Sequence, residues 1–334
     1  MTARLVAVNG VNIACAVQGK GPPLVLVMGY RLNSTAWPPT FIAQLAQRFT
    51  VITLDNRGTG LSDKPVTGYA IANVARDVRG LLDELQVEHV HMLGYSMGGA
   101  IAQEFVRQFP DRVKGLILCA TMAGGPSATF AEPPVVRVMR DLDGLTPEQA
   151  ARRIWTVTYA PGYLGKHRAL AEEQMKREIA LPTPLHAADL QFQAFAEFDG
   201  SQALSTIRKP VLILTGDLDR LISPQNSRNP ASPPTAPLLV PAGDPTVACF
   251  NGRLSLSRKI PLLSFHSSLN GLPIRFIHQW TLLKAVRFCA LKLHRPKQSH
   301  SLSNSLSSVS ISPLSKVIAR NSALPYPVQK ANSP

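Results

Sequence analysis

The stretch HVHMLGYSMGGAIAQEFV, residues 89–106, decides how this chain folds. Its first five residues suit a buried strand, and its last part has the apolar spacing of a helix. Between the two, Gly94 and Gly98 lie two residues before and two residues after Ser96. Glycine is needed at these places because strand and helix pass close together in a sharp turn. The stretch therefore predicts a strand–turn–helix unit that presents the Ser96 hydroxyl as a nucleophile.

Strand and helix patterns alternate through the first 122 residues. This alternation is typical of an α/β fold with a mostly parallel sheet and helices on both faces. Asn9-Gly10 between two strand-like runs predicts a tight hairpin at the N-terminal end. The expected strands cover residues 4–8, 11–18, 24–28, 51–54, 89–93 and 113–119. The expected helices cover residues 41–49, 71–85 and 98–109.

After residue 122 the strand patterns stop, and helical composition indicates an inserted cap. Strand patterns return at 211–215 and 238–240, and the five prolines of 224–237 exclude a continuous helix between them. The aromatic residues of the cap that suggest an apolar pocket are Trp155, Tyr159, Tyr163 and Phe192. The expected division is a core in residues 1–122, a cap in 123–205, an incomplete second part of the core in 206–243 and a tail in 244–334.

The tail differs sharply from the rest of the chain in charge. Residues 1–244 hold 23 Lys and Arg residues and all 21 Asp and Glu residues, whereas residues 245–334 hold 12 Lys and Arg residues and no acidic residue. A shifted reading frame, a retained non-coding stretch or a degraded gene end fits this change. The alternative is a basic tail that binds nucleic acid or an anionic membrane. We expect an irregular or disordered tail, not a folded domain, and neither nucleic acid nor membrane as a partner.

Backbone N–H groups near Ser96 are the candidates for binding an oxyanion. A helix beginning at Met97 points its first N–H groups toward the reacting carbonyl, and the Met97 N–H is the first expected donor. Gly29 allows the backbone to turn after the strand at 24–28, so the Tyr30 N–H is the second expected donor. An aromatic lid over the site is the alternative role of Tyr30.

Three motifs of this sequence together resemble the α/β-hydrolase superfamily, namely Gly94-Tyr95-Ser96-Met97-Gly98-Gly99, Asp55-Asn56-Arg57-Gly58-Thr59-Gly60-Leu61-Ser62 and Leu26-Val27-Met28-Gly29. Within it, the sequence is most similar to bacterial esterases and enol-lactonases with a helical cap, over residues 4–243. The resemblance implies a structural loop at 55–62, with Arg57 bonded to backbone carbonyls, and neither a metal nor an organic cofactor. A serine at position 96 disfavours the relatives with an aspartate nucleophile, such as epoxide hydrolases and haloalkane dehalogenases.

The resemblance also implies an acid after the strand that follows the cap. In Gly216-Asp217-Leu218-Asp219, Asp219 takes the role of orienting the catalytic base and stabilising its imidazolium. Asp217 is the alternative acid, and its competing interpretation is a turn residue that bonds to its own backbone.

The catalytic histidine is not found where the resemblance places it, shortly after the last strand. Residues 238–243 suit that strand, and no histidine follows in residues 244–250. His266 is the nearest downstream candidate. The other histidines are His278, His294 and His300 in the tail, His89 and His91 before the turn, and His167 and His186 in the cap.

These observations predict a serine hydrolase of carboxylic esters or lactones that forms an acyl-enzyme at Ser96. Activity depends on a histidine reaching that serine, and the alternative is an impaired or truncated relative that acts at most as a small-molecule binder. The expected partner is a small-molecule ester or lactone. Cys15 and Cys119 lie in apolar runs and are expected to be buried free thiols. Without a membrane-length apolar run or a signal-peptide pattern, the cytoplasm is the expected location.

Overall fold

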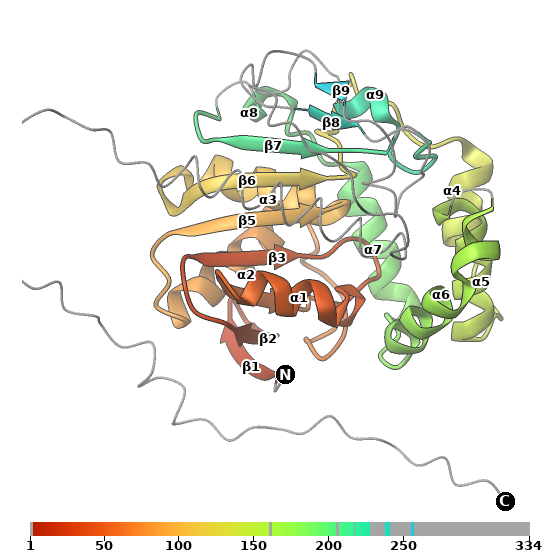
Figure 1. Ribbon diagram of the computed structural model, residues 1–334, viewed down its shortest axis with the longest axis horizontal. Coiled ribbons are helices and arrows are strands. Elements are labelled where there is room, and N and C mark those ends of the chain that lie inside the picture. The colour runs from red at the N-terminus through yellow and green to blue at the C-terminus, as the bar shows by residue number, and fades with distance from the viewer. Residues whose placement is uncertain are drawn as a thin grey trace, which may run out of the picture.

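Nine strands of the described residues form one mixed β-sheet (Figure 1). The computed structural model describes residues 3–159, 162–204, 207–216, 218–227, 238–240 and 255–256. The strands are β1 Arg4–Val8, β2 Val11–Gln18, β3 Pro23–Val27, β4 Thr50–Leu54, β5 Val90–Tyr95, β6 Val113–Cys119, β7 Val211–Leu214, β8 Leu238–Val240 and β9 Ser255–Leu256. Their order across the sheet is β1-β2-β4-β3-β5-β6-β7-β8-β9. From β4 to β8 neighbouring strands are parallel, and β1, β2 and β9 join antiparallel.

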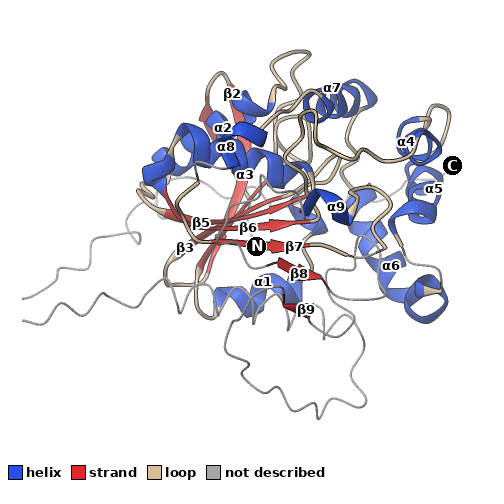
Figure 2. Ribbon diagram, turned by 90° about the horizontal axis from the view of Figure 1, so that it is seen from above, coloured by secondary structure: helices blue, strands red, loops and turns tan. Residues whose placement is uncertain are grey.

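The described helices lie on both faces of this sheet and beyond the carboxyl ends of its central strands. They are α1 Pro39–Ala46, α2 Ile71–Glu84, α3 Met97–Gln108, α4 Pro133–Arg140, α5 Pro147–Thr158, α6 Tyr163–Ile179, α7 Leu185–Ala196, α8 Ser201–Leu204 and α9 Pro224–Ser227. Figure 2 shows α2, α3 and α8 on one face and α1 on the other. The expected mostly parallel sheet with helices on both faces is confirmed.

Local sequence explains the elements around the N-terminal hairpin well. Asn9 and Gly10 both have positive φ, 46° and 77°, as a tight two-residue turn requires. The strands on either side have the bounds expected from the sequence. Helix α1 begins two residues earlier than the expected helix at 41–49, and it ends three residues earlier than that helix. Its first residue is Pro39. Proline suits this position because a backbone N–H in the first turn would have no acceptor within the helix, so its absence costs nothing there.

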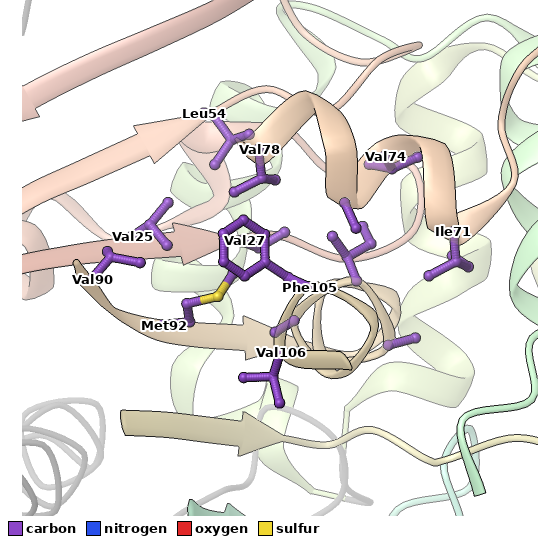
Figure 3. Packing of buried hydrophobic residues seen from close by; sticks show 14 of the residues in the cluster. Val25, Val27, Leu54, Ile71, Val74, Val78, Val90, Met92, Phe105 and Val106 are labelled. Atoms are coloured by element: carbon purple, nitrogen blue, oxygen red, sulfur yellow. The ribbon is translucent and has the colours of Figure 1, made fainter. Parts of the chain in front are cut away.

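The larger part of the core lies between the sheet and the pair α2 and α3 (Figure 3). Ile71, Val74 and Val78 of α2 form one apolar face, and all three are buried. Phe105 of α3 is fully buried against Met92 of β5 in the same cluster. A second cluster packs α1 onto the opposite face of the sheet. The central strands are therefore covered on both sides, which explains their continuous apolar sequences.

Helices α4 to α7 lie between β6 and β7 in the chain. Figure 1 shows α4, α5 and α6 beyond the carboxyl ends of the central strands, and α7 closer to the sheet. Helix α5 begins with a capping box, in which the Thr146 side chain accepts from the Gln149 N–H and the Gln149 side chain accepts from the Thr146 N–H. This helical stretch agrees with the sequence pattern that defined the expected cap.

The C-terminal predictions fall largely outside the described residues. Helix α9 occupies the first four residues of the segment whose prolines exclude a continuous helix. Of the expected tail, the structure describes β9, which pairs antiparallel with β8. The division of the chain into core, cap and tail stays a prediction. Cys15 and Cys119 are buried, as expected, and neither forms a disulfide with another described residue.

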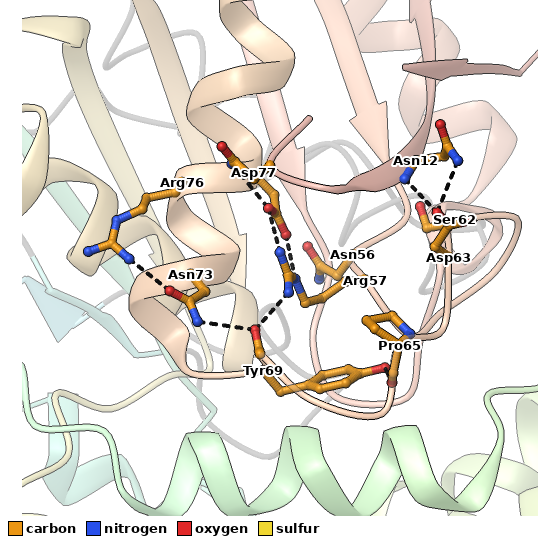
Figure 4. Close-up of polar contacts among 12 residues, drawn as sticks. Asn12, Asn56, Arg57, Ser62, Asp63, Pro65, Tyr69, Asn73, Arg76 and Asp77 are labelled. Atoms are coloured by element: carbon orange, nitrogen blue, oxygen red, sulfur yellow. Dashed lines mark hydrogen bonds and ion pairs between the residues drawn. The ribbon is translucent and has the colours of Figure 1, made fainter. Parts of the chain in front are cut away.

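The loop at residues 55–62 is held by a buried ion pair that sequence analysis did not identify (Figure 4). The Arg57 Nε donates to Asp77 Oδ2 at 2.6 Å, and its Nη2 donates to Asp77 Oδ1 at 2.7 Å. One guanidinium nitrogen donates to the Gly68 carbonyl oxygen at 2.8 Å. The expectation that Arg57 binds backbone carbonyls therefore holds for one contact, and its main partner is the carboxylate on α2. The two side chains are only 8% and 1% exposed.

Replacement of Asp77 by alanine should destabilise the fold strongly, because it leaves the Arg57 guanidinium buried without its carboxylate. We expect the free energy of unfolding to fall by about 3–5 kcal/mol, measured by denaturant unfolding. The matched control is Asp83→Ala on the same helix, whose carboxylate is 45% exposed and pairs with Arg79 and Arg112. Exposed ion pairs contribute little, so this control should lose about 1 kcal/mol or less. Equal losses in the two variants would contradict the prediction.

Candidate active site

Ser96 lies at the sharp turn between β5 and α3, as the sequence predicts. Its backbone has φ 54° and ψ −124°, a conformation that side-chain-bearing residues rarely adopt. The Ser96 N–H donates to the Cys119 carbonyl oxygen of β6 at 2.9 Å, and the Gly99 N–H donates to the Ser96 carbonyl oxygen at 2.8 Å. The side chain is half-buried and lines a cavity. The fold therefore imposes a strained backbone on the residue whose hydroxyl it presents.

The glycines around Ser96 are required by close backbone contacts. A Cβ at Gly94 would collide with the carbonyl oxygen of Gly98, and a Cβ at Gly98 would collide with the carbonyl oxygen of Val27 on β3. Both obstacles are backbone atoms, which a side-chain rearrangement cannot move. Strand β5, helix α3 and strand β3 can approach one another here only without side chains at these two positions.

The loop after β3 passes directly over Ser96. A Cβ built at Gly29 would lie 2.8 Å from Ser96 Cβ and 3.4 Å from Ser96 Oγ. The next residue is Tyr30, whose ring packs edge-on against Phe192 of α7 at 5.9 Å between centroids. Met97 is the first residue of α3, so its N–H has no acceptor within that helix. The structure thus brings Ser96 and the two candidate oxyanion donors to one place.

Asp219 follows β7 and is buried, 5% exposed. Its Oδ1 accepts from the N–H groups of Leu221 at 2.9 Å and Ile222 at 2.8 Å. Its Oδ2 is buried and has no hydrogen-bond partner among the described residues. Burial raises the pKa of this carboxyl to about 7, although the two N–H groups act in the opposite direction. One oxygen of Asp219 is therefore held in place and the other is available to a donor.

A cavity of about 590 Å³ opens at the carboxyl ends of the central strands, within the size range of small-molecule sites. Ser96 and Tyr30 line it, and so do Leu221 and Ile222, which hold Asp219. Most of the lining is apolar or aromatic, and Arg31 and Glu178 are the charged residues among the described lining. Of the four aromatic residues expected at the pocket, three line it, namely Trp155, Tyr159 and Phe192. The fourth, Tyr163, is buried and stacks on Tyr159 at 5.1 Å.

No histidine in the part of the chain that the structure describes lines this cavity. His91 is buried on β5 against Phe49, and His186 is exposed with its ring nitrogen 3.4 Å from the Lys64 carbonyl oxygen. The sequence candidate for the base, His266, and the alternative acid, Asp217, both lie outside the described residues. The residues that the structure describes contain no cluster of His, Cys, Asp and Glu suited to a metal ion. No described helix is long and apolar enough to cross a bilayer.

Gln191 of α7 supports this site through a contact that was not expected from the sequence. Gln191 is 2% exposed and accepts a hydrogen bond from the Arg31 N–H at 3.0 Å. The sequence shows a glutamine among the apolar positions of this helix face, which is a signal that the residue has a polar partner. It does not show which partner, because Arg31 lies 160 residues away in the chain. The contact shows that the helical segment supports the loop beside Ser96 as well as covering the cavity.

Known proteins place this arrangement in a family. The family model for the alpha/beta hydrolase fold matches residues 22–241. The 3-oxoadipate enol-lactonase 2 of Acinetobacter baylyi is 32% identical over 222 residues, which cover 66% of this chain and 78% of that protein. An uncharacterized protein of Mycobacterium tuberculosis is 45% identical over 118 residues. The matched residues cover 35% of this chain and 34% of the mycobacterial protein.

The fold has close counterparts among solved structures. A thermophilic esterase from Thermogutta terrifontis superposes with a TM-score of 0.66 at 23% identity, over 88% of this chain and 99% of the esterase. At this identity the likeness shows the fold alone. The family model, by contrast, matches the sequence itself across strands β3 to β8, the Ser96 turn and the helical segment. This chain therefore belongs to the α/β-hydrolase fold family.

Proposed function

We propose that this protein hydrolyses carboxylic esters or lactones through an acyl-enzyme at Ser96. The observation that carries the proposal is the strained Ser96 backbone, φ 54° and ψ −124°, at a strand–helix turn that opens into an apolar cavity. Such strain persists only where the surrounding structure enforces it, and it gathers at functional sites. The name of one similar protein, the enol-lactonase of Acinetobacter baylyi, supports the same reaction class.

The proposed reaction uses Ser96 Oγ to attack the carbonyl carbon of the substrate. A base removes the hydroxyl proton, the carbonyl oxygen becomes an oxyanion, and the N–H groups of Met97 and Tyr30 stabilise it. Collapse of this intermediate breaks the bond to the leaving oxygen, which takes the proton from the base. Water then repeats the sequence and releases the acid. Asp219 orients the base through its available Oδ2, and His266 remains the sequence candidate for that base.

The cavity lining indicates which esters would fit. Met28, Trp37 and Trp155 present apolar surface to the cavity, and the described charged residues there are few. A substrate with an apolar acyl or alcohol group would bury that group here, at about 25 cal/mol per Å² of apolar surface removed from water. We propose that residues 123–205 act as the cap that supplies much of this surface, over a core formed by 1–122 and 206–243.

Labelling with a fluorophosphonate tests this function directly. We expect one adduct per chain, formed within minutes and detected by intact mass, and no adduct on Ser96→Ala. Rapid reaction requires an activated serine, because an ordinary serine hydroxyl is a weak nucleophile. Labelling that needs added imidazole would show an assembled nucleophile without an internal base. The absence of any adduct, with or without imidazole, would contradict the proposal and favour a small-molecule binder.

A further inference from the structure

The loop after β3 is tied to the cap by hydrogen bonds from residues far along the chain. The Arg31 N–H donates to Gln191 Oε1 at 3.0 Å, and the Thr183 hydroxyl donates to the Arg31 carbonyl oxygen at 2.8 Å. These partners follow Arg31 by 160 and 152 residues. The Asn33 side-chain amide also donates to the Leu181 carbonyl oxygen, at 3.2 Å. The chain at and before α7 therefore holds this loop along its length.

Gln191 has both ends of its amide committed. Its oxygen accepts from Arg31, and its Nε2 donates to the Arg57 carbonyl oxygen at 3.0 Å. The donor on one side and the carbonyl on the other fix which amide atom faces which partner. An apolar side chain would leave the partly buried Arg31 N–H and the buried Arg57 carbonyl oxygen without this partner, and an ionised carboxylate could serve only the Arg31 N–H.

Arg31 needs this support because its backbone is strained. Its φ is 62°, in the left-handed region that a residue with a side chain avoids. The two hydrogen bonds from the cap satisfy its N–H and its carbonyl oxygen in this conformation. The Arg31 N–H belongs to the peptide unit that joins it to Tyr30, so this bond also fixes the backbone next to the Tyr30 N–H. The Tyr30 ring is held by Phe192, the neighbour of Gln191 on α7.

We propose that Gln191 and Thr183 are positioning residues for the oxyanion hole. They hold Arg31 in its strained conformation and thereby aim the Tyr30 N–H at the carbonyl oxygen of a substrate bound at Ser96. This inference rests on the proposed hydrolase function. It makes the docked cap helix a condition for the catalytic geometry, in addition to its role as a cover of the cavity.

The test compares Gln191→Leu with Gln193→Leu. Gln193 lies on the same helix, is exposed and donates to Glu197 at 2.8 Å. For a short p-nitrophenyl ester we expect Gln191→Leu to lower kcat by about 10- to 100-fold at nearly unchanged KM, part of the full effect of one oxyanion donor. Hydrogen exchange of the Arg31 amide should become faster by about tenfold or more because its acceptor is gone. Gln193→Leu should match the wild type in both measurements.

Two further variants distinguish the loss of these hydrogen bonds from a general loss of folding. Thr183→Val removes the hydroxyl and nearly keeps the shape, and we expect it to lower kcat by about threefold to tenfold. In Gln191→Glu burial favours the protonated carboxyl, which can accept from the Arg31 N–H and donate to the Arg57 carbonyl oxygen, so this variant should recover most of the kcat that Gln191→Leu loses. Each rate is divided by the fraction of chains whose Ser96 a fluorophosphonate labels. This division prevents unfolded protein in a sample from being counted as a lower kcat.

The outcomes separate this inference from the function on which it rests. A wild-type chain that hydrolyses esters, with unchanged kcat per titrated site in both Gln191→Leu and Thr183→Val, overturns the positioning role alone. Lower kcat with unchanged exchange at Arg31 also overturns it, since the loop would then not have moved. A wild-type chain that neither hydrolyses esters nor reacts at Ser96, with or without imidazole, overturns the proposed function and this inference together.

Discussion

Replacement of Ser96 by alanine is expected to lower ester hydrolysis by about 10⁴- to 10⁶-fold. Alanine removes the only atom that can form the acyl-enzyme and leaves the cavity and the candidate N–H donors in place. A residual rate of roughly 10³–10⁴ over water is expected from these remaining groups. The measurement is hydrolysis of a p-nitrophenyl ester by purified wild-type and variant protein under the same conditions.

The control for this variant is Ser201→Ala, a serine at the start of α8 that does not line the cavity. It should hydrolyse the ester within about twofold of the wild type, as expected for a substitution away from the reacting groups. Ser96→Ala should also bind an apolar ligand with unchanged affinity in calorimetry, because the apolar and aromatic residues of the lining are untouched. A variant that keeps more than a tenth of the wild-type rate would exclude Ser96 as the nucleophile.

The Ser96 turn and the N-terminal hairpin could be predicted from sequence because their causes are local. Gly94 and Gly98 are needed where backbones nearly touch, and the collisions at both positions involve backbone oxygens. Asn9 and Gly10 adopt the positive φ values that their residue types favour. In both cases a few adjacent residues set the conformation, so a short motif carries most of the information.

The contacts that support the site could not be predicted, because they join distant parts of the chain. Arg57 was expected on backbone carbonyls and instead pairs mainly with Asp77, whose place on α2 gives no hint of this partner. Gln191 reaches Arg31 only once α7 has docked. Helical periodicity shows that such residues belong to a helix, but not which backbone group they will meet. These pairings follow from tertiary packing alone.

Asp219→Asn should lower ester hydrolysis by about 10⁴-fold, because an asparagine amide cannot stabilise an imidazolium. The oxygen of the introduced amide can still accept from the N–H groups of Leu221 and Ile222, so the local backbone should be preserved. The measurement is kcat for the same p-nitrophenyl ester. Asp199→Asn, at an exposed carboxylate bonded to Ser201, is the matched control and should match the wild-type rate.

The same substitution should stabilise the fold, and the pH dependence of this gain identifies its cause. Burial raises the pKa of Asp219 to about 7 from 3.8 in the unfolded chain. Between these values the folded state binds more protons, so the free energy of unfolding falls as the pH rises from about 4 to 7. Asparagine cannot ionise and escapes this loss, so its advantage should be absent at pH 4 and on the order of 2–4 kcal/mol at pH 8.

Denaturant unfolding of both proteins at pH 4.5 and pH 8 measures this difference without any substrate. The opposite sign, with the wild type gaining on Asp219→Asn as the pH rises, would mean that the folded pKa of Asp219 lies below 3.8. A further hydrogen-bond donor beside the available Oδ2, neutral or charged, would lower the pKa of this buried carboxyl. The stability of the two proteins therefore tests whether a further hydrogen-bond donor, such as the proposed base, reaches Asp219 Oδ2 in the folded protein.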